Sequence, residues 1–220
     1  MSFRLSYVRP LLVAAVAMLA IACQPSDDPR ETVGQGEQAA PEEPPVGVVA
    51  GGVPQTLGGL FDRVDEPAGE WQSGARPAEI LTRMSEESVG SARVTFVSGG
   101  ADRFLVVNLS DDGMSQDAPS LAGLELGILP SGAVDEIEPA DALADAPALI
   151  DAAAPALDEC GFGDEVTSVL YTTGAPAAWT GDAWAEAPSW RGLLRVGDAG
   201  TVHVDPRSGE LSDDGCRPSD

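Results

Sequence analysis

The sequence ARVTFVSGGADRFLVVNL, residues 92–109, indicates the fold class. Its two arms are rich in bulky β-forming residues, and the turn-forming stretch 99–102 separates them. The β-formers are Val94, Phe96, Phe104, Val106 and Val107. The pattern predicts a β-hairpin with strands at 92–98 and 103–109.

The same signals recur toward the C-terminus. Residues 190–196 and 201–205 flank the glycine-containing turn 197–200 and predict a second hairpin. Residues 165–172 predict a further strand, and the polar tail after 210 carries almost no apolar residue of its own.

Two other stretches predict helices. Residues 77–89 begin with proline, which suits the first helical position, and Ile80, Leu81 and Met84 would share a face. Residues 140–160 are rich in alanine, and the prolines at 147 and 155 predict two short helices or a kinked one.

Helices mixed with local hairpins indicate an α+β fold, a small antiparallel sheet packed by short helices, in one domain at 57–220. The order of the elements, together with VHVDPRSGEL at 202–211, resembles the PepSY and cystatin-like small domains of bacterial envelope proteins.

The N-terminus has the pattern of an export signal. Arg4 and Arg9 precede an unbroken apolar run at 11–22, which Cys23 follows. A membrane-spanning helix needs roughly 20 apolar residues, so this run is too short to span and has the length typical of a signal peptide.

The sequence LAIAC, residues 19–23, resembles the lipobox of bacterial lipoproteins, in which cleavage leaves a cysteine that is acylated. The resemblance implies a signal peptide at 1–22, a lipid on Cys23 that anchors the protein in a membrane, and, from Gln24, the outer membrane of the bacterial envelope. Ala20 departs from the pattern, because leucine is commoner there. Residues 20–22 also suit ordinary signal peptidase, so secretion with a free Cys23 stays the alternative.

Residues 23–56 are predicted to be a disordered acidic tether. The stretch 24–55 holds six prolines, no aromatic residue and a net charge of −5, so it cannot bury enough apolar surface to offset its chain entropy. A flexible chain of that length would hold the domain roughly 30 Å from its anchor, and an extended one about 100 Å.

The cysteine count supports the lipid. If Cys23 is acylated, Cys160 and Cys216 remain and can form a disulfide in an oxidising compartment. That bond would pin the C-terminal tail to the end of the alanine-rich helix. A metal-binding or nucleophilic role is the alternative, although neither cysteine lies in a C-x-x-C motif.

The charge excludes one class of partner. The chain has 36 acids, 12 arginines and no lysine, and loss of residues 1–22 moves the net charge from −24 to −26. Such a surface repels phosphate backbones, so nucleic acid is excluded as a partner. Solubility, adaptation to a salty medium and cation binding are all compatible with the charge.

No catalytic, metal or cofactor site is predicted. His203 is the single histidine, and no G-x-S-x-G motif accompanies it. The pentapeptide LSDDG occurs at 109–113 and 211–215, where it predicts turns, with an oxygen-ligated metal as the alternative.

Trp179, Trp184 and Trp190 are the candidate binding residues, because tryptophan dominates the energetics of interfaces and stacks on sugars. We therefore expect a non-catalytic envelope domain that binds a protein or a glycan. The rival hypothesis is a hydrolase that uses carboxylates alone.

Overall fold

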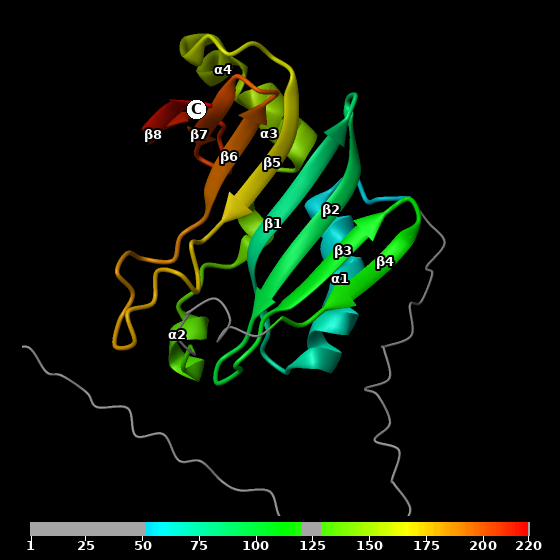
Figure 1. Ribbon diagram of the computed structural model, residues 1–220, viewed down its shortest axis with the longest axis vertical. Coiled ribbons are helices and arrows are strands. Elements are labelled where there is room, and N and C mark those ends of the chain that lie inside the picture. The colour runs from blue at the N-terminus through cyan, green and yellow to red at the C-terminus, as the bar shows by residue number, and fades with distance from the viewer. Residues whose placement is uncertain (1–51, 120–128, 220) are drawn as a thin grey trace, which may run out of the picture. The chain divides into compact units, whose positions relative to one another are not determined.

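An antiparallel sheet of eight strands, in the order β4-β3-β2-β1-β5-β6-β7-β8, forms the centre of the structure (Figure 1). The computed structural model describes residues 52–119 and 129–219, which belong to one compact unit, 44–220. The strands are β1 (Arg76–Ser85), β2 (Ser88–Val97), β3 (Leu105–Ser110), β4 (Gly113–Asp117), β5 (Val166–Thr172), β6 (Arg191–Val196), β7 (Gly200–Val204) and β8 (Leu211–Pro218). The helices are α1 (Leu57–Trp71), α2 (Ser131–Asp135), the 3-10 turn η2 (Ala140–Ala142), α3 (Ala146–Ala152) and α4 (Ala154–Cys160). The α+β class is confirmed.

The sheet consists of two four-stranded meanders. Strands β1 to β4 follow one another in space, as do β5 to β8, and the two sets meet where β1 pairs with β5. A helix precedes each set in the chain: α1 the first, and α3 with α4 the second.

The helix predicted at 77–89 is wrong, because most of this stretch forms β1. Its residues also alternate with period two: Ile80 and Thr82 are buried, whereas Leu81 and Arg83 face the other way. The strand pairs with β2 on one side and β5 on the other, and these two ladders outweigh the local helical spacing.

The other predicted elements are confirmed. Both hairpins are present, as β2–β3 and β6–β7. The alanine-rich stretch gives two short helices, α3 and α4, each with proline in its first turn. Gly161 ends α4 in the left-handed conformation, with φ of 67°.

Four elements were not predicted: helices α1 and α2 and strands β4 and β8. Helix α1 begins at the N-cap Thr56, whose hydroxyl accepts a hydrogen bond from the N–H of Gly59 at 3.1 Å. Strands β4 and β8 form the two edges of the sheet and are mostly exposed. The C-terminal tail is thus a strand paired with β7, not a segment held by the disulfide alone.

Helices α1, α3 and α4 pack on one face of the sheet and share its main core (Figure 1). Buried Tyr171 on β5 donates from its hydroxyl to the carbonyl of Ala144 at 2.8 Å. Asp145 accepts a hydrogen bond from the N–H of Leu57 at 2.6 Å, which joins the start of α1 to the loop before α3.

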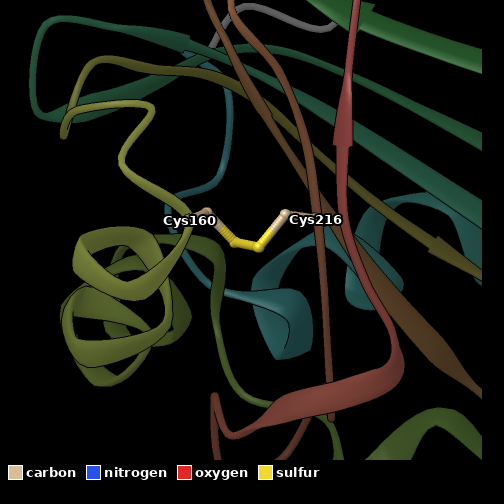
Figure 2. The surroundings of a disulfide bond; sticks show 2 residues. All are labelled: Cys160 and Cys216. Carbon is tan, nitrogen blue, oxygen red and sulfur yellow. A yellow bond between two sulfur atoms is a disulfide. The ribbon is translucent and has the colours of Figure 1, made fainter.

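Cys160 and Cys216 form the expected disulfide, with their Cα atoms 5.5 Å apart (Figure 2). It joins the last residue of α4 to edge strand β8.

A second, smaller apolar cluster lies at one end of the sheet. It contains Ala78, Val97, Leu129, Val134 and Ile137. Gly99 is required there, because a Cβ would collide with the backbone of Ser131 at the start of α2.

The signal peptide, Cys23 and most of the predicted tether lie outside the described residues. The packed chain already includes Val53, which is buried, and Gln55, whose side-chain amide bonds both backbone groups of Val89. Among the helices within 52–119 and 129–219, none has the length and apolar character that crossing a bilayer requires.

Candidate functional site

Trp179 and Trp184 lie together in the loop that joins β5 to β6. Their rings meet edge to face, with centroids 5.2 Å apart and planes inclined by 74°. A short antiparallel bridge joins the two residues, and the N–H of Thr180 donates to the carbonyl of Ala183 at 3.1 Å. Both indoles pack against the smaller apolar cluster and remain half-exposed.

Trp190 does not join this pair. It is 4% exposed and belongs to the main core, and its Nε1–H donates to the carbonyl of Glu138 at 2.8 Å. Its ring is therefore a structural part of the fold, and no ligand can stack on it without unpacking the core.

A hollow of about 460 Å³ lies beside the exposed pair. Besides Trp179 and Trp184, it is lined by Glu136, Asp182, Ala183, Ala187 and Pro188. Aromatic faces with nearby carboxylates suit a ligand that has an apolar surface and hydrogen-bond donors.

His203 lies on β7, on the face of the sheet away from the helices, and its side chain is 11% exposed. Burial lowers its pKa, and the charges of Arg217 and Arg191 lower it further, whereas Asp214 raises it. The imidazole is therefore neutral at pH 7, and the 3.9 Å between its Nδ1 and Asp214 is not an ion pair.

The two LSDDG copies occupy different places. Residues 109–113 form the turn between β3 and β4, as predicted, whereas 211–215 lie within β8. Within the described part of the chain, no group of three or more histidine, cysteine or acidic side chains is placed to hold a metal ion.

The sheet face opposite α1, α3 and α4 carries a concentration of arginines. Among the described strand residues, five arginines alternate with core positions and point to this face: Arg83, Arg93, Arg191, Arg195 and Arg217. Three acids share it: Glu79, Asp117 and Asp214. Because the whole chain holds 36 acids against 12 arginines, this face reverses the charge balance of the protein.

Three of these arginines lie in one regular row across the strands. Register partners run from β2 through β1, β5, β6 and β7 to β8, and arginine alternates with a hydroxyl residue. The row reads Ser91, Arg83, Ser168, Arg195, Thr201, Arg217. We call it the arginine row.

A second row, two residues farther along the strands, is apolar at the centre of the sheet. Leu81, Leu170 and Leu193 are register neighbours and each is half-buried. Arg93 flanks this leucine row on one side and His203 on the other.

Sequence reasoning missed this face because it used the arginines only as a total charge. Arg83 and Arg93 do alternate with apolar residues in the sequence, which is a signal for an outward-facing position. Their meeting with Arg195 and Arg217 depends on the pairing of β1 with β5, which no local pattern specifies.

Comparisons of the chain with protein-family models, with curated proteins and with solved structures find no match. Function is therefore inferred from the chain's own residues.

Proposed function

We propose that the chain is a lipid-anchored protein of the bacterial envelope whose domain binds a glycan, without catalysis, at the hollow beside Trp179 and Trp184. The observation that carries the proposal is the half-exposed, edge-to-face tryptophan pair bordering a hollow with two carboxylates.

The chemistry of the hollow matches a sugar ring. The C–H face of a pyranose packs on an indole, and its hydroxyls donate to carboxylate oxygens, which only accept when ionised. Glu136 and Asp182 are the acids that line the hollow; Asp182 lies between the two tryptophans in the sequence, and Glu136 precedes both.

The exposure of the two acids favours binding over hydrolysis. A glycosidase needs one carboxylic acid that keeps its proton at neutral pH, and burial in an apolar pocket is the usual cause. Glu136 and Asp182 are both exposed to solvent.

The anchor rests on the sequence LAIAC with its upstream apolar run. Labelling cells with a radioactive fatty acid should mark the wild-type protein, and Cys23→Ser should abolish the label and release the protein from the membrane fraction. A Cys23→Ser protein that stays membrane-bound would refute the lipid anchor without touching the glycan site.

The hollow is tested by calorimetric titration with chitotetraose, cellotetraose and maltotetraose. Trp179→Ala should weaken binding of the preferred sugar about tenfold or more, the usual effect of removing an aromatic hot spot. Trp71→Ala, at the end of α1 and half-exposed, is the matched control and should leave affinity unchanged.

Two results would overturn the glycan proposal. One is a lack of binding to all three neutral sugars by a folded protein. The other is release of shorter sugars that disappears in Glu136→Gln, which would make the domain a hydrolase.

A further inference from the structure

The arginine row has a constant spacing. Neighbouring strands of a sheet lie about 4.8 Å apart, so arginines on every second strand repeat at about 10 Å and the six positions span about 24 Å. Arg83, Arg195 and Arg217 occupy alternate strands β1, β6 and β8 of the row, with Ser168 and Thr201 between them. The face thus presents guanidinium and hydroxyl groups in strict alternation along a line.

Two of these guanidinium groups lack an acid. Among the described residues, Arg93 pairs with Glu79 at 3.0 Å, Arg217 with Asp214 at 3.1 Å, and Arg191 with Glu186. No carboxylate of the described chain pairs with Arg83 or Arg195, which flank Ser168 in direct register. Both are exposed. The Nε–H of Arg195 donates to the carbonyl of Gly197 at 3.3 Å, so an incoming anion would meet the two terminal nitrogens of Arg195 and the guanidinium group of Arg83.

We infer that this face binds a linear acidic polysaccharide that carries an anionic group on every second sugar and lies across the strands along the arginine row. A guanidinium group forms paired, charge-assisted hydrogen bonds with a carboxylate or sulfate. Serine and threonine hydroxyls both donate and accept, as the hydroxyls of the intervening neutral sugars do. One sugar ring has about the length of one step between strands, so charged and neutral units meet arginine and hydroxyl in turn.

The neighbouring residues suit the same ligand. The leucine row lies about 7 Å from the arginine row, two residues along each strand, and gives the C–H faces of the sugars an apolar surface. A shallow hollow of about 190 Å³ next to Arg83 and Arg93, lined also by Ser91 and Asn108, leaves room for a substituent on the chain.

The acidity of the whole protein does not prevent this contact. At physiological ionic strength, charges are screened beyond about 8 Å. The helices, which carry many of the acids, pack on the opposite face of the sheet. A ligand on the arginine row is therefore governed mainly by the five arginines of its own face, the three strand acids and Glu186, which pairs with Arg191.

An acidic peptide fits less well. Its carboxylates could meet the arginines, but side chains on one face of an extended peptide repeat at about 7 Å, which does not match arginines about 10 Å apart. A nucleic acid carries a phosphate at every unit and is likewise mismatched to an alternating row.

The inference is independent of the tryptophan hollow. The arginine row crosses β5 at Ser168, whereas the tryptophan loop leaves β5 after Thr172 and packs on the smaller apolar cluster. The experiment uses Trp179→Ala as its background, so failure of one site cannot be mistaken for failure of the other.

The test is calorimetric titration at physiological salt. The protein is residues 23–220, in which Cys23→Ser prevents acylation. The probe is a hyaluronan octasaccharide, in which charged and neutral sugars alternate. Chitooctaose is the neutral comparison, an oligogalacturonate of equal length is charged at every sugar, and oligoglutamate and a DNA octamer represent the other classes.

Hyaluronan should bind best of the five. Arg83→Gln with Arg195→Gln should weaken it about tenfold or more, because hydrogen bonds from charged groups are stronger than those between neutral groups. Ser168→Ala should weaken it severalfold. Arg103→Gln removes an exposed arginine from the loop before β3 and should change the affinity less than twofold.

Three results would overturn the inference: no binding of hyaluronan, unchanged binding by the folded double variant, or equal binding of oligoglutamate or DNA. Tighter binding of the oligogalacturonate would support a polysaccharide ligand but refute the alternation of charged and neutral sugars.

Discussion

The two meanders of the sheet have the same topology but are secured by different means. The first, β1 to β4, is covered by the 15-residue helix α1, whose buried residues Leu57, Leu60 and Val64 recur at helical spacing. The second, β5 to β8, is covered mainly by α4, whereas α3 packs on α4 and also contacts β2 of the first meander. These two helices have seven residues each, and each buries one alanine and one leucine. Its edge strand is also fixed by the disulfide.

The difference shows how apolar burial and a covalent bond can substitute for each other. A long amphipathic helix secures its meander by surface removed from water, at about 25 cal/mol per Å². Two short alanine-rich helices bury less, and a bond between Cys160 and Cys216 restricts the unfolded chain instead. We therefore expect the redox state to act on the stability of the whole domain through the second meander, where the bond lies.

Removing the disulfide should have the largest effect on stability. The bond closes a loop with a sequence separation of 56, for which the chain-entropy relation gives about 4 kcal/mol. Cys160→Ser and Cys216→Ser should lower the free energy of unfolding by similar amounts in urea titrations, and the double variant by no more than either alone.

A reductant should reproduce this loss in the wild-type protein and add nothing to Cys160→Ser. Two free thiols at 160 and 216, found by mass spectrometry of the unreduced mature protein, would contradict both the pairing and the contrast between the meanders.

Truncating a leucine in either half tests whether the halves form one cooperative unit. Leu60 in α1 is 2% exposed and Leu149 in α3 is 0% exposed, and both belong to the same core cluster. Leu60→Ala and Leu149→Ala should each cost about 3 kcal/mol through lost burial and the cavity left behind.

Because the core is shared, each variant should unfold in one transition whether followed by tryptophan fluorescence or by circular dichroism. Two separated transitions would mean that the meanders fold independently, and the shared-core interpretation would be wrong.

Tyr171 tests the polar link at the middle of the sheet. Its hydroxyl bonds the carbonyl of Ala144, and burial raises its pKa above the usual value, with the charge of Asp145 adding to the rise. Tyr171→Phe should lower the free energy of unfolding by about 1 kcal/mol, the net contribution of such a bond.

Ultraviolet titration provides a second readout. The measurement uses residues 23–220, in which Tyr171 is the single tyrosine. Because the folded pKa is raised, the stability contributed by the neutral hydroxyl is complete below the unfolded pKa near 10 and is lost as the pH rises above it, so phenolate absorption should appear together with alkaline unfolding. Ionisation of a still-folded protein near pH 10 would contradict the burial.

The sequence predicted what short-range patterns encode. Turn residues and β-formers predicted both hairpins, and Pro147 and Pro155 predicted the break between α3 and α4. The sequence predicted a helix in place of β1 because Ile80 and Met84, four residues apart, fit the 3.6-residue repeat of a helix as well as the two-residue repeat of a strand.

What the sequence could not predict depends on pairing over long distances. Strands β4 and β8 have little apolar character and exist as partners of β3 and β7. Trp190 looked like a neighbour of Trp184 in the chain, yet strand β6 carries it into the core. The arginine row requires the ladder between β1 and β5, whose residues are more than 80 positions apart.

The smallest expected effect compares His203 with Asn108, which take the same place in the two halves. Leu81 on β1 and Leu170 on β5 are register partners where the two halves meet. Asn108 on β3 lies two strands outward from Leu81, and His203 on β7 lies two strands outward from Leu170. Burial lowers the pKa of His203 below its usual value of about 6.5, whereas Asn108 does not titrate. The unfolded chain then binds the proton more readily than the folded one, so the stabilising contribution is complete above pH 6.5 and is lost as the pH falls through the lowered folded pKa.

His203→Asn should remove that component and flatten the fall in unfolding free energy between pH 7.5 and 5.5. Because His203 is the only histidine, its ring-proton NMR shift can be followed without assignment, and the midpoint should lie below 6.5. A midpoint above 6.5 would mean that Asp214 outweighs burial and the two arginines, and the pH dependence would then take the opposite sign.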